Sequence, residues 1–330
     1  MKLRVFGAML LSLLLYVDTA SAKTELLVYT AVEPNYLNLY KKGFESAYPD
    51  ISITWVRDST GVITARLLAE KDAPKADAVF GLAASSLLLL QKEGLLLPYK
   101  PEGYDKLSPR MRDNSAEPVW VAMNAWTSGM AINKPEMEKL GLPHPKSWAD
   151  LADPRYKGLI AMPDPASSGT GYMNLAAWIQ VMGEEKGWAY ADALMANVKL
   201  LSHSGSKPGT MAAQGEIAIG IGSPAFMKPL LKRRAPIDIV FMEDGLGWEA
   251  EATAIIKTTD KADAARKLMD WTCSEAVGKI AADFSGLAGR PEFTTPESKK
   301  AEELMIDNDL QWAAENRDRL LKEWRNRYAR

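Results

Sequence analysis

The sequence predicts an α/β protein made of two lobes, each built on a doubly wound parallel sheet. The chain has 330 residues, which is more than one hydrophobic core usually holds, so two lobes are expected. Each half of the chain also contains three strand–loop–helix units in succession. That alternation is typical of parallel sheets covered by helices.

The N-terminus has the pattern of a cleavable secretory signal peptide. Lys2 and Arg4 precede an apolar segment at residues 5–17, and Ala20-Ser21-Ala22 follows as a small-residue cleavage site. The apolar segment is too short to anchor the protein in a bilayer. We therefore expect cleavage after Ala22 and export of the mature chain to the periplasm.

The first half of the mature chain contains three β-rich runs, each followed by a small polar loop and a segment with helical spacing. The runs lie at residues 26–30, 51–56 and 78–80. Two extended segments, at residues 119–123 and 129–132, then bracket the point where we expect the chain to cross into a second lobe.

The second half repeats this order, with strand runs at residues 159–162, 198–201 and 217–221. Two further extended runs accompany the return toward the first lobe, and the remainder reads as helix. We expect a signal peptide at 1–22, the first part of lobe 1 at 23–123 and lobe 2 at 124–235. Residues 236–330 return to lobe 1 and end in helices that pack across the lobes.

Composition argues against several classes of function. The formal net charge is −2, which provides no basic field for nucleic acid or anionic membrane. The single cysteine, Cys273, cannot form an intramolecular disulfide, and the two histidines lie far apart in sequence. The sequence also lacks GxSxG, HExxH, CxxC and P-loop patterns. We expect no enzyme activity, no metal and no cofactor.

The loop at residues 163–172 is the strongest functional signal. It reads Pro163-Asp164-Pro165-Ala166-Ser167-Ser168-Gly169-Thr170-Gly171-Tyr172 and lies between a strand run and a helical segment. Such a loop points backbone N–H groups and hydroxyls at an anion. The alternative is that its serines only cap the helix.

Five other loops occupy the same position after a predicted strand, where open α/β sheets bind their ligands. Hydroxyls and glycines dominate these loops, which suits a small phosphate, phosphonate or carboxylate. An ammonium group on the ligand would need a nearby carboxylate, and aromatic rings would add a cation–π wall. The predicted ligand-contacting residues are Glu33, Tyr36, Asp58, Ser59, Thr60, Ser85, Trp126, Ser167, Ser168, Gly169, Thr170, Ser206, Ser223 and Glu249.

Each of these residues has a structural alternative. The serines and threonines are also ordinary helix caps, Glu33 suits a helix N-terminus through the helix dipole, and the tryptophans also suit a hydrophobic core. What favours a binding role is that matching loops occur in both halves.

The mature chain resembles the periplasmic solute-binding proteins of ABC importers over essentially its whole length. The segments Leu27-Val28-Tyr29-Thr30-Ala31, Ala76-Asp77-Ala78-Val79-Phe80 and Ser147-Trp148-Ala149-Asp150-Leu151 resemble the ferric-ion and thiamine-binding members. The loops 165–171 and 203–208 most resemble the 2-aminoethylphosphonate-binding branch.

The resemblance implies a type II-like fold of two lobes that close on the ligand about a hinge. It also implies a monomer that delivers 2-aminoethylphosphonate, or a close phosphonate, to the permease of an ABC importer. The phosphonate would lie on Ser168, Gly169 and Thr170 of one lobe and on Ser59 and Thr60 of the other. The amine would face Glu33, with Asp58 or Glu249 as alternatives.

Two other functions stay open at this stage. A ferric-ion or other small-anion-binding protein would share the fold, but the ferric members use a tyrosine pair where this chain has Pro224-Ala225-Phe226-Met227. An exported hydrolase or transferase would need a general base, for which the loops offer only Glu33, Asp58 and Glu249.

Overall fold

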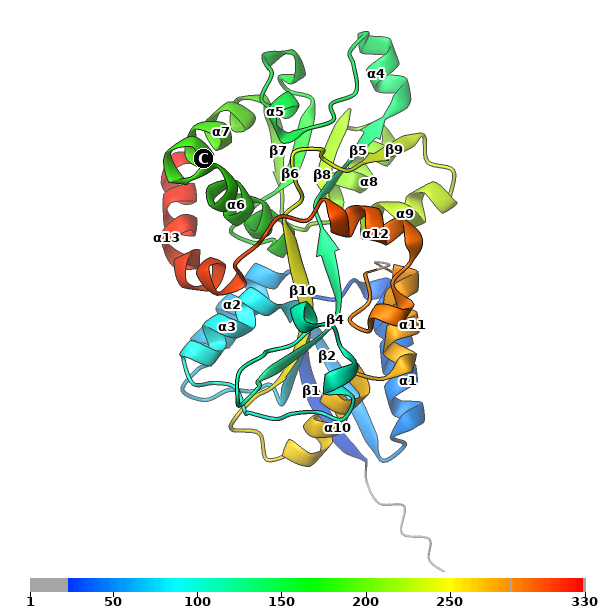
Figure 1. Ribbon diagram of the computed structural model, residues 1–330, viewed down its shortest axis with the longest axis vertical. Coiled ribbons are helices and arrows are strands. Elements are labelled where there is room, and N and C mark those ends of the chain that lie inside the picture. The colour runs from blue at the N-terminus through cyan, green and yellow to red at the C-terminus, as the bar shows by residue number, and fades with distance from the viewer. Residues whose placement is uncertain (1–22, 285–286, 329–330) are drawn as a thin grey trace, which may run out of the picture.

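The computed structural model describes residues 23–284 and 287–328, and these residues form two lobes, each built on its own five-stranded sheet (Figure 1). The expected signal peptide, residues 1–22, lies outside the described residues. The two-lobed α/β fold class predicted from the sequence is confirmed.

Lobe 1 is built on a sheet with the strand order β2-β1-β3-β10-β4. The strands β1, β2 and β3 run parallel, and β10 pairs antiparallel with both β3 and β4. Its strands are β1 (Thr24–Thr30), β2 (Ile51–Arg57), β3 (Ala78–Ala83), β4 (Trp120–Thr127) and β10 (Trp248–Ile255). Its helices are α1 (Pro34–Ala47), α2 (Thr60–Ala69), α3 (Ala84–Lys92), α10 (Ala262–Thr272) and α11 (Glu275–Phe284), with short 3₁₀ turns at Tyr104–Lys106, Pro109–Met111 and Pro291–Phe293.

Lobe 2 repeats this plan with the strand order β7-β6-β8-β5-β9. Here β6 runs parallel to β7 and β8, whereas β5 is antiparallel to β8 and β9. Its strands are β5 (Gly129–Asn133), β6 (Ile160–Pro163), β7 (Val198–Ser202), β8 (Ile219–Gly222) and β9 (Ile237–Val240). Its helices are α4 (Lys134–Leu140), α5 (Trp148–Leu151), α6 (Gly169–Met182), α7 (Glu184–Asn197), α8 (Lys207–Gln214) and α9 (Pro224–Lys232), with a 3₁₀ turn at Pro154–Tyr156.

The chain crosses between the two sheets twice, where β4 leads into β5 and where β9 leads into β10 (Figure 1). Both crossings lie later than the expected boundaries at 123 and 235. The whole of β4 up to Thr127 pairs with β10 in lobe 1, and β9 still pairs with β5 in lobe 2. β10 enters lobe 1 from lobe 2, and β5 enters lobe 2 from lobe 1, which is why each is antiparallel to both of its neighbours. The sheets are therefore mixed, with one antiparallel strand in each.

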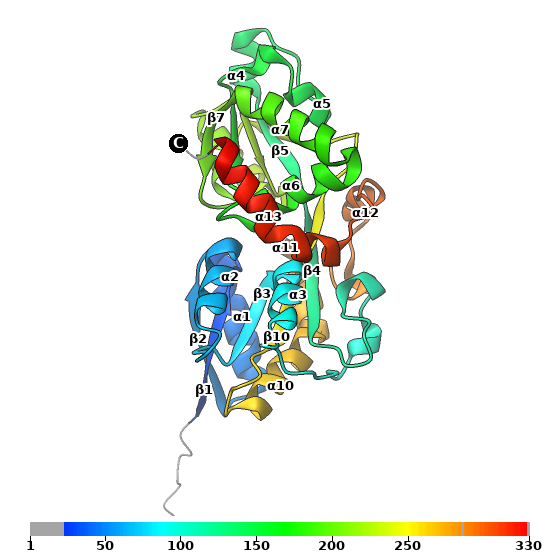
Figure 2. The same ribbon diagram turned by 90° about the vertical axis from the view of Figure 1, so that its left-hand side faces the viewer.

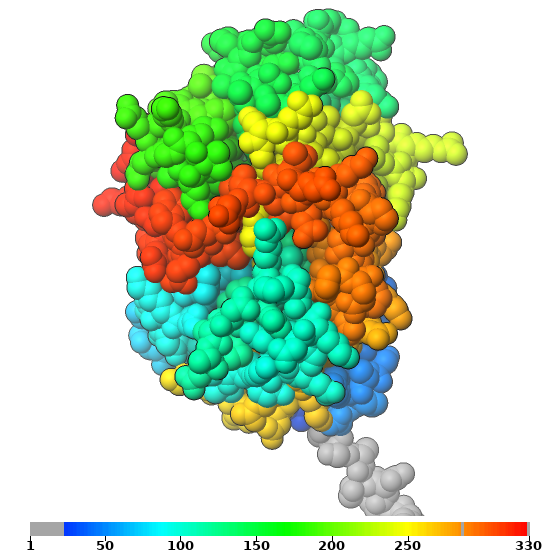
Figure 3. Space-filling model, in the orientation of Figure 1, coloured from blue at the N-terminus to red at the C-terminus, as the bar shows by residue number. Residues whose placement is uncertain are grey.

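The C-terminal helices α12 (Pro296–Glu303) and α13 (Leu310–Tyr328) return to lobe 2. Three apolar side chains of α13, Leu320, Leu321 and Trp324, belong to the hydrophobic core of that lobe. Figure 2 shows α13 lying beside α6, above α3 of lobe 1. In the space-filling view the orange and red C-terminal segment runs across the junction of the two lobes (Figure 3). These helices thus contact both lobes.

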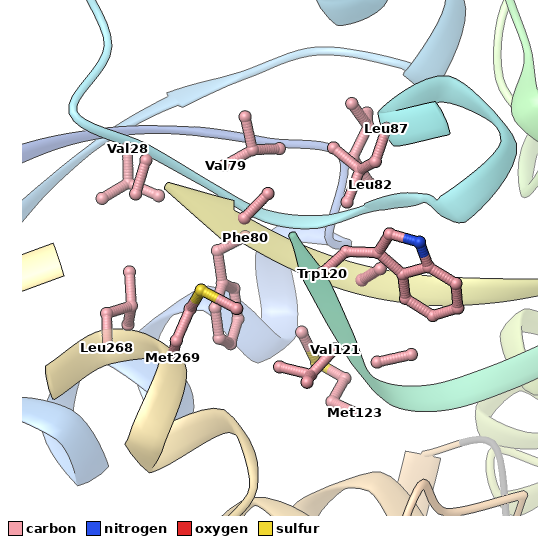
Figure 4. Packing of buried hydrophobic residues seen from close by; sticks show 14 of the residues in the cluster. Val28, Val79, Phe80, Leu82, Leu87, Trp120, Val121, Met123, Leu268 and Met269 are labelled. Carbon is pink, nitrogen blue, oxygen red and sulfur yellow. The ribbon is translucent and has the colours of Figure 1, made fainter. Parts of the chain in front are cut away.

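Each lobe has its own hydrophobic core around its sheet. In lobe 1 Phe80 points toward Leu268 and Met269 of α10, whereas its neighbour Val79 points to the opposite face of the sheet, and Val28 belongs to the same cluster (Figure 4). All five are fully buried, and such close packing fixes the strand ends that carry the binding loops. No helix within the described residues is long and apolar enough to cross a membrane.

Candidate functional site

The candidate site is a cleft between the two lobes, at the carboxyl ends of their parallel strands. The space within it measures about 490 Å³, including the part open to solvent. Lobe 1, the crossing strands and lobe 2 all contribute to its wall. The lining residues are Ala31, Glu33, Arg57, Ser59, Thr60, Gly81, Trp126, Ser168, Gly169, Thr170, Ser204, Gly205, Phe226, Glu251 and Phe284.

The N-terminus of α6 forms the lobe 2 side of the cleft. After β6, the backbone carbonyl of Asp164 accepts hydrogen bonds from the N–H groups of Ser167 and Ser168. This turn leads the chain into the helix. Ser168 is the N-cap residue, and its hydroxyl accepts the N–H of Gly171 at 3.3 Å. Ser168 therefore both caps the helix and lines the cleft, so the two interpretations of this loop are compatible.

The loop after β7 brings Ser204 and Gly205 next to the α6 N-terminus. A Cβ atom on Gly205 would lie 2.5 Å from the Thr170 hydroxyl oxygen, so only glycine allows this approach. Ser167 is not among the lining residues of the cleft, and its hydroxyl donates to the backbone carbonyl of His203 at 2.9 Å. Thr170 and Ser204 thus complete a wall of hydroxyls around the first turn of α6.

Ser59 and Thr60 form the opposing wall at the start of α2. Ser59 occupies the N-cap position, yet its side chain makes no capping hydrogen bond. Both residues are buried and line the cleft. Hydroxyls that are not used for capping remain available to a ligand.

The two lobes touch along this part of the cleft. The N–H of Gly61 donates to the carbonyl of Ser167 at 2.9 Å, and Asp58 pairs with Nε2 of His203 at 3.0 Å. The hydrogen bond from His203 lowers the pKa of Asp58. The structure therefore shows a closed arrangement of the two lobes.

Two carboxylates line the lobe 1 side of the cleft. Glu33 precedes α1 and forms an ion pair with Arg57 at 3.4 Å. Glu251 lies on β10 and accepts a hydrogen bond from Nδ2 of Asn124 at 2.6 Å. Burial raises the pKa of Glu251 to about 7, and the nearby charge of Glu33 adds to this effect.

Three aromatic side chains, Trp126, Phe226 and Phe284, supply the apolar part of the cleft. Phe226 comes from lobe 2 and Phe284 from lobe 1, and their ring centroids lie 5.5 Å apart. Such faces pack against hydrocarbon and attract cations. The predicted contact Tyr36 is not among the lining residues, because its ring packs behind Phe284 with centroids 4.4 Å apart.

Glu249 and Ser85 do not line the cleft. The hydroxyl of Ser85 donates to the buried carboxylate of Glu249, and burial raises the pKa of Glu249 to about 7. Arg317 of α13 is also buried, with its guanidinium 4.4 Å from the centre of the Tyr172 ring, and its charge favours the ionised form of Glu249. This group of residues joins β10, α3, α6 and α13 at the junction of the lobes.

Two further predicted residues, Ser206 and Ser223, also lie outside the cleft. Ser206 lies 3.4 Å from Ser204 through their hydroxyl oxygens. Ser223 lines a separate cavity behind Trp126, and its buried hydroxyl has no hydrogen-bond partner within the described part of the chain. Asp58 belongs to the contact between the lobes described above.

The cleft also contains residues that were not singled out from the sequence, chiefly Arg57, Phe226, Glu251 and Phe284. Glu251 lies on β10, which begins at Trp248. Arg57 is the last residue of β2 and directly precedes a predicted binding loop, so its position in the sequence already indicated a place near the ligand. Phe284 closes a helix distant in sequence, and no local pattern marks it. No group of three or more potential metal ligands occurs among the described residues.

Comparison with known proteins adds to this geometry. The family model of bacterial extracellular solute-binding proteins matches residues 73–316. An uncharacterised protein of Haemophilus influenzae is 28% identical, over 98% of this chain and 96% of its own. A putative 2-aminoethylphosphonate-binding periplasmic protein of Salmonella typhimurium is 24% identical, over 79% of this chain and 77% of its own.

Among solved structures, the periplasmic binding protein AfuA from Actinobacillus pleuropneumoniae, with exogenous fructose-6-phosphate bound, is similar over most of the chain. It superposes with a TM-score of 0.85 and 28% sequence identity, and the match covers 92% of this chain and 98% of AfuA. The match of the family model extends over well more than half of the sequence. The chain belongs to the family of bacterial extracellular solute-binding proteins.

Proposed function

We propose that this protein is the periplasmic binding component of an ABC importer, and that it captures a small organic phosphonate, with 2-aminoethylphosphonate as the main ligand. The observation that carries the proposal is the ring of hydroxyls and helix N-termini around one end of the cleft. Ser168, Gly169 and Thr170 provide it from lobe 2, and Ser59 and Thr60 provide it from lobe 1.

A phosphonate group suits this end of the cleft for two reasons. The helices α6 and α2 both begin here, and the dipoles of both helices favour negative charge at this point. Hydroxyl donors on both sides can share the three phosphonate oxygens without a full counter-charge. A ligand held by both lobes also stabilises the closed arrangement, so binding and closure occur together.

The remainder of the cleft suits a short chain with a cationic end. The aromatic rings provide an apolar surface, and Glu33 and Glu251 provide negative charge. The resemblance to the putative 2-aminoethylphosphonate-binding protein of Salmonella typhimurium supports this proposal. Delivery to a membrane permease by an exported monomer follows from the same proposal.

A sugar phosphate is the second candidate, because AfuA binds fructose-6-phosphate and shares 28% of its sequence with this chain. The same hydroxyl ring would hold the phosphate, and the carboxylates would accept hydrogen bonds from the sugar. Ferric ion fits less well, since the described cleft lining contains no tyrosine and no histidine.

Thermal-shift measurements test the ligand class. The melting temperature of the purified protein is measured without ligand and with each ligand well above its dissociation constant. The ligands are 2-aminoethylphosphonate, fructose-6-phosphate, phosphate, ferric citrate and thiamine. A ligand at about 100 times that constant adds about 2.7 kcal/mol to the free energy of unfolding. We expect the largest shift with 2-aminoethylphosphonate. A shift with ferric citrate and none with any phosphorus compound would refute the proposal.

Variants of the hydroxyl ring test the location of the site. The double variant Ser168→Ala/Thr170→Ala removes two donors from the α6 N-terminus, and we expect affinity to fall by about 2 kcal/mol or more. Ser223→Ala is the matched control, because Ser223 also precedes a lobe 2 helix but lines a different cavity. Its removal should leave affinity unchanged. If the double variant binds the phosphonate as tightly as the Ser223→Ala control does, the phosphonate binds elsewhere.

A further inference from the structure

The lobe 1 floor of the cleft contains an acceptor without a partner. Glu251 is 8% exposed, and its Oε2 accepts the Asn124 amide at 2.6 Å. No hydrogen bond from a described residue reaches Oε1, although the side chain lines the cleft. A carboxylate oxygen that faces the cleft and accepts no hydrogen bond from the protein is open to a donor on the ligand.

The distribution of charge around the cleft points in the same direction. The lining residues of lobe 2 are uncharged, whereas lobe 1 contributes Glu33, Glu251 and Arg57. Arg57 is already paired with Glu33 at 3.4 Å. The carboxylate of Glu251 therefore lacks a cation of its own, in a cleft whose other end is built for an anion.

We propose that Glu251 selects the ligand by its ammonium group, so that the cleft distinguishes an aminoalkyl phosphonate from an equally large alkyl phosphonate. This inference rests on the proposed function and names the residue that recognises the ammonium end of the ligand. The ammonium binds Oε1 of Glu251, the phosphonate binds the hydroxyl ring, and the aromatic side chains contact the carbon chain between them.

Binding then moves a proton, because the ammonium favours the ionised form of Glu251. The groups that face Glu251 are Asn124 on β4, which donates to it, Glu33 before α1, which repels it, and Tyr40 on α1. Burial raises the pKa of Glu251 to about 7, so in the unliganded protein at pH 7 the carboxyl group is partly protonated. The bound ammonium lowers that pKa, and part of a proton is released.

Isothermal titration calorimetry with two ligands tests the proposal. The probes are 2-aminoethylphosphonate and propylphosphonate, in which a methyl group replaces the ammonium at similar size. We expect the wild-type protein to prefer 2-aminoethylphosphonate, and Glu251→Gln to reduce that preference by about 10- to 100-fold, because a hydrogen bond between two charged groups is lost. Unchanged or tighter binding of propylphosphonate shows that the variant is folded.

The matched control is Glu249→Gln, which changes another buried carboxylate two residues away on the same strand. Glu249 does not line the cleft, so this variant should keep the wild-type preference. Equal affinity of the wild-type protein for both phosphonates, or an unchanged preference in Glu251→Gln, would overturn the inference.

Two further results separate the inference from the proposed function. Tighter binding of fructose-6-phosphate than of 2-aminoethylphosphonate, abolished in Glu251→Gln, would mean that Glu251 recognises hydroxyls instead of ammonium. If none of the three compounds (2-aminoethylphosphonate, propylphosphonate and fructose-6-phosphate) binds, the proposed function itself is wrong. Titrations at pH 7 in buffers of different ionisation enthalpy should show more proton release by the wild-type protein than by Glu251→Gln, because any proton exchanged by the phosphonate itself is common to both proteins.

Discussion

Glu249 and Glu251 lie two residues apart on β10, and their carboxylates face different surroundings. Glu249 accepts the Ser85 hydroxyl outside the cleft, whereas Glu251 lines the cleft and is bound by Asn124. Burial raises the pKa of each to about 7. The same strand thus carries one carboxylate that joins structural elements and one that is left open to a ligand.

Burial of Glu251 should make the stability of the unliganded protein depend on pH. Its pKa is about 7 in the folded state, against an ordinary value of 4.5. Below the ordinary value both states hold the proton. As pH rises toward 7 only the unfolded state ionises, so the free energy of unfolding falls.

The variant Glu251→Gln lacks this dependence. We expect it to equal the wild-type protein in stability near pH 4.5 and to exceed it by roughly 2 to 3 kcal/mol at pH 8, in ligand-free urea titrations. The expectation fails if the difference between the two proteins is the same at both pH values. If Glu251→Gln stabilises the protein but removes its selectivity, the carboxylate of Glu251 serves ligand binding at the expense of stability.

Closure of the lobes depends on Gly169. A Cβ atom at this position would lie 2.6 Å from the hydroxyl oxygen of Thr60 in the opposite lobe. Gly169→Ala should therefore oppose closure and weaken ligand affinity by about tenfold or more, while the unliganded protein unfolds at nearly the wild-type temperature.

Gly171→Ala provides the contrast, because a Cβ atom there would lie 2.7 Å from the backbone of Pro163 and Asp164 in the same lobe. That variant should lower the melting temperature of the unliganded protein. Calorimetric scans with and without ligand measure both effects. A lower melting temperature for unliganded Gly169→Ala would show that the contact with Thr60 is not the reason for this glycine.

The contact between Asp58 and His203 should contribute little to closure. Their side chains are 44% and 62% exposed, and exposed ion pairs contribute roughly 0.2 to 1 kcal/mol. Asp58→Asn should weaken ligand affinity by less than about fivefold. The hydrogen bond lowers the pKa of Asp58, so the contribution is present above the ordinary aspartate pKa and is lost as pH falls through the lowered one.

A double-mutant cycle with Asp58→Asn and His203→Gln isolates this pair. The coupling energy should be small and should decrease at high salt, because the pair lies at the surface. A coupling above about 2 kcal/mol would instead assign the pair a major part in holding the cleft shut.

The parts of the fold that local sequence patterns determine could be predicted. Short-range signals such as the β-rich runs correspond to strands in the structure. The loop at 163–172 lines the cleft through its second serine, a glycine and a threonine, as the alternation of strand, loop and helix suggested.

Features that depend on long-range packing could not be predicted. Ser85 follows a strand like the other predicted loops, but it is bound by Glu249, which is 164 residues away in sequence. Glu251 and Phe284 reach the cleft only because β10 and α11 complete lobe 1 from the far end of the chain. No local pattern reports such neighbours. For the same reason the chain crosses between the lobes later than expected.

The return of the chain to both lobes has a consequence for how the protein folds during synthesis. Lobe 1 lacks its β10 strand until residue 255 is made, and the core of lobe 2 lacks Leu320 and Trp324 until the last helix is complete. A growing polypeptide emerges N-terminus first, so neither core can close on the ribosome before most of the chain exists. We expect the nascent chain to remain open and accessible to chaperones throughout translation, and to fold largely as a finished polymer.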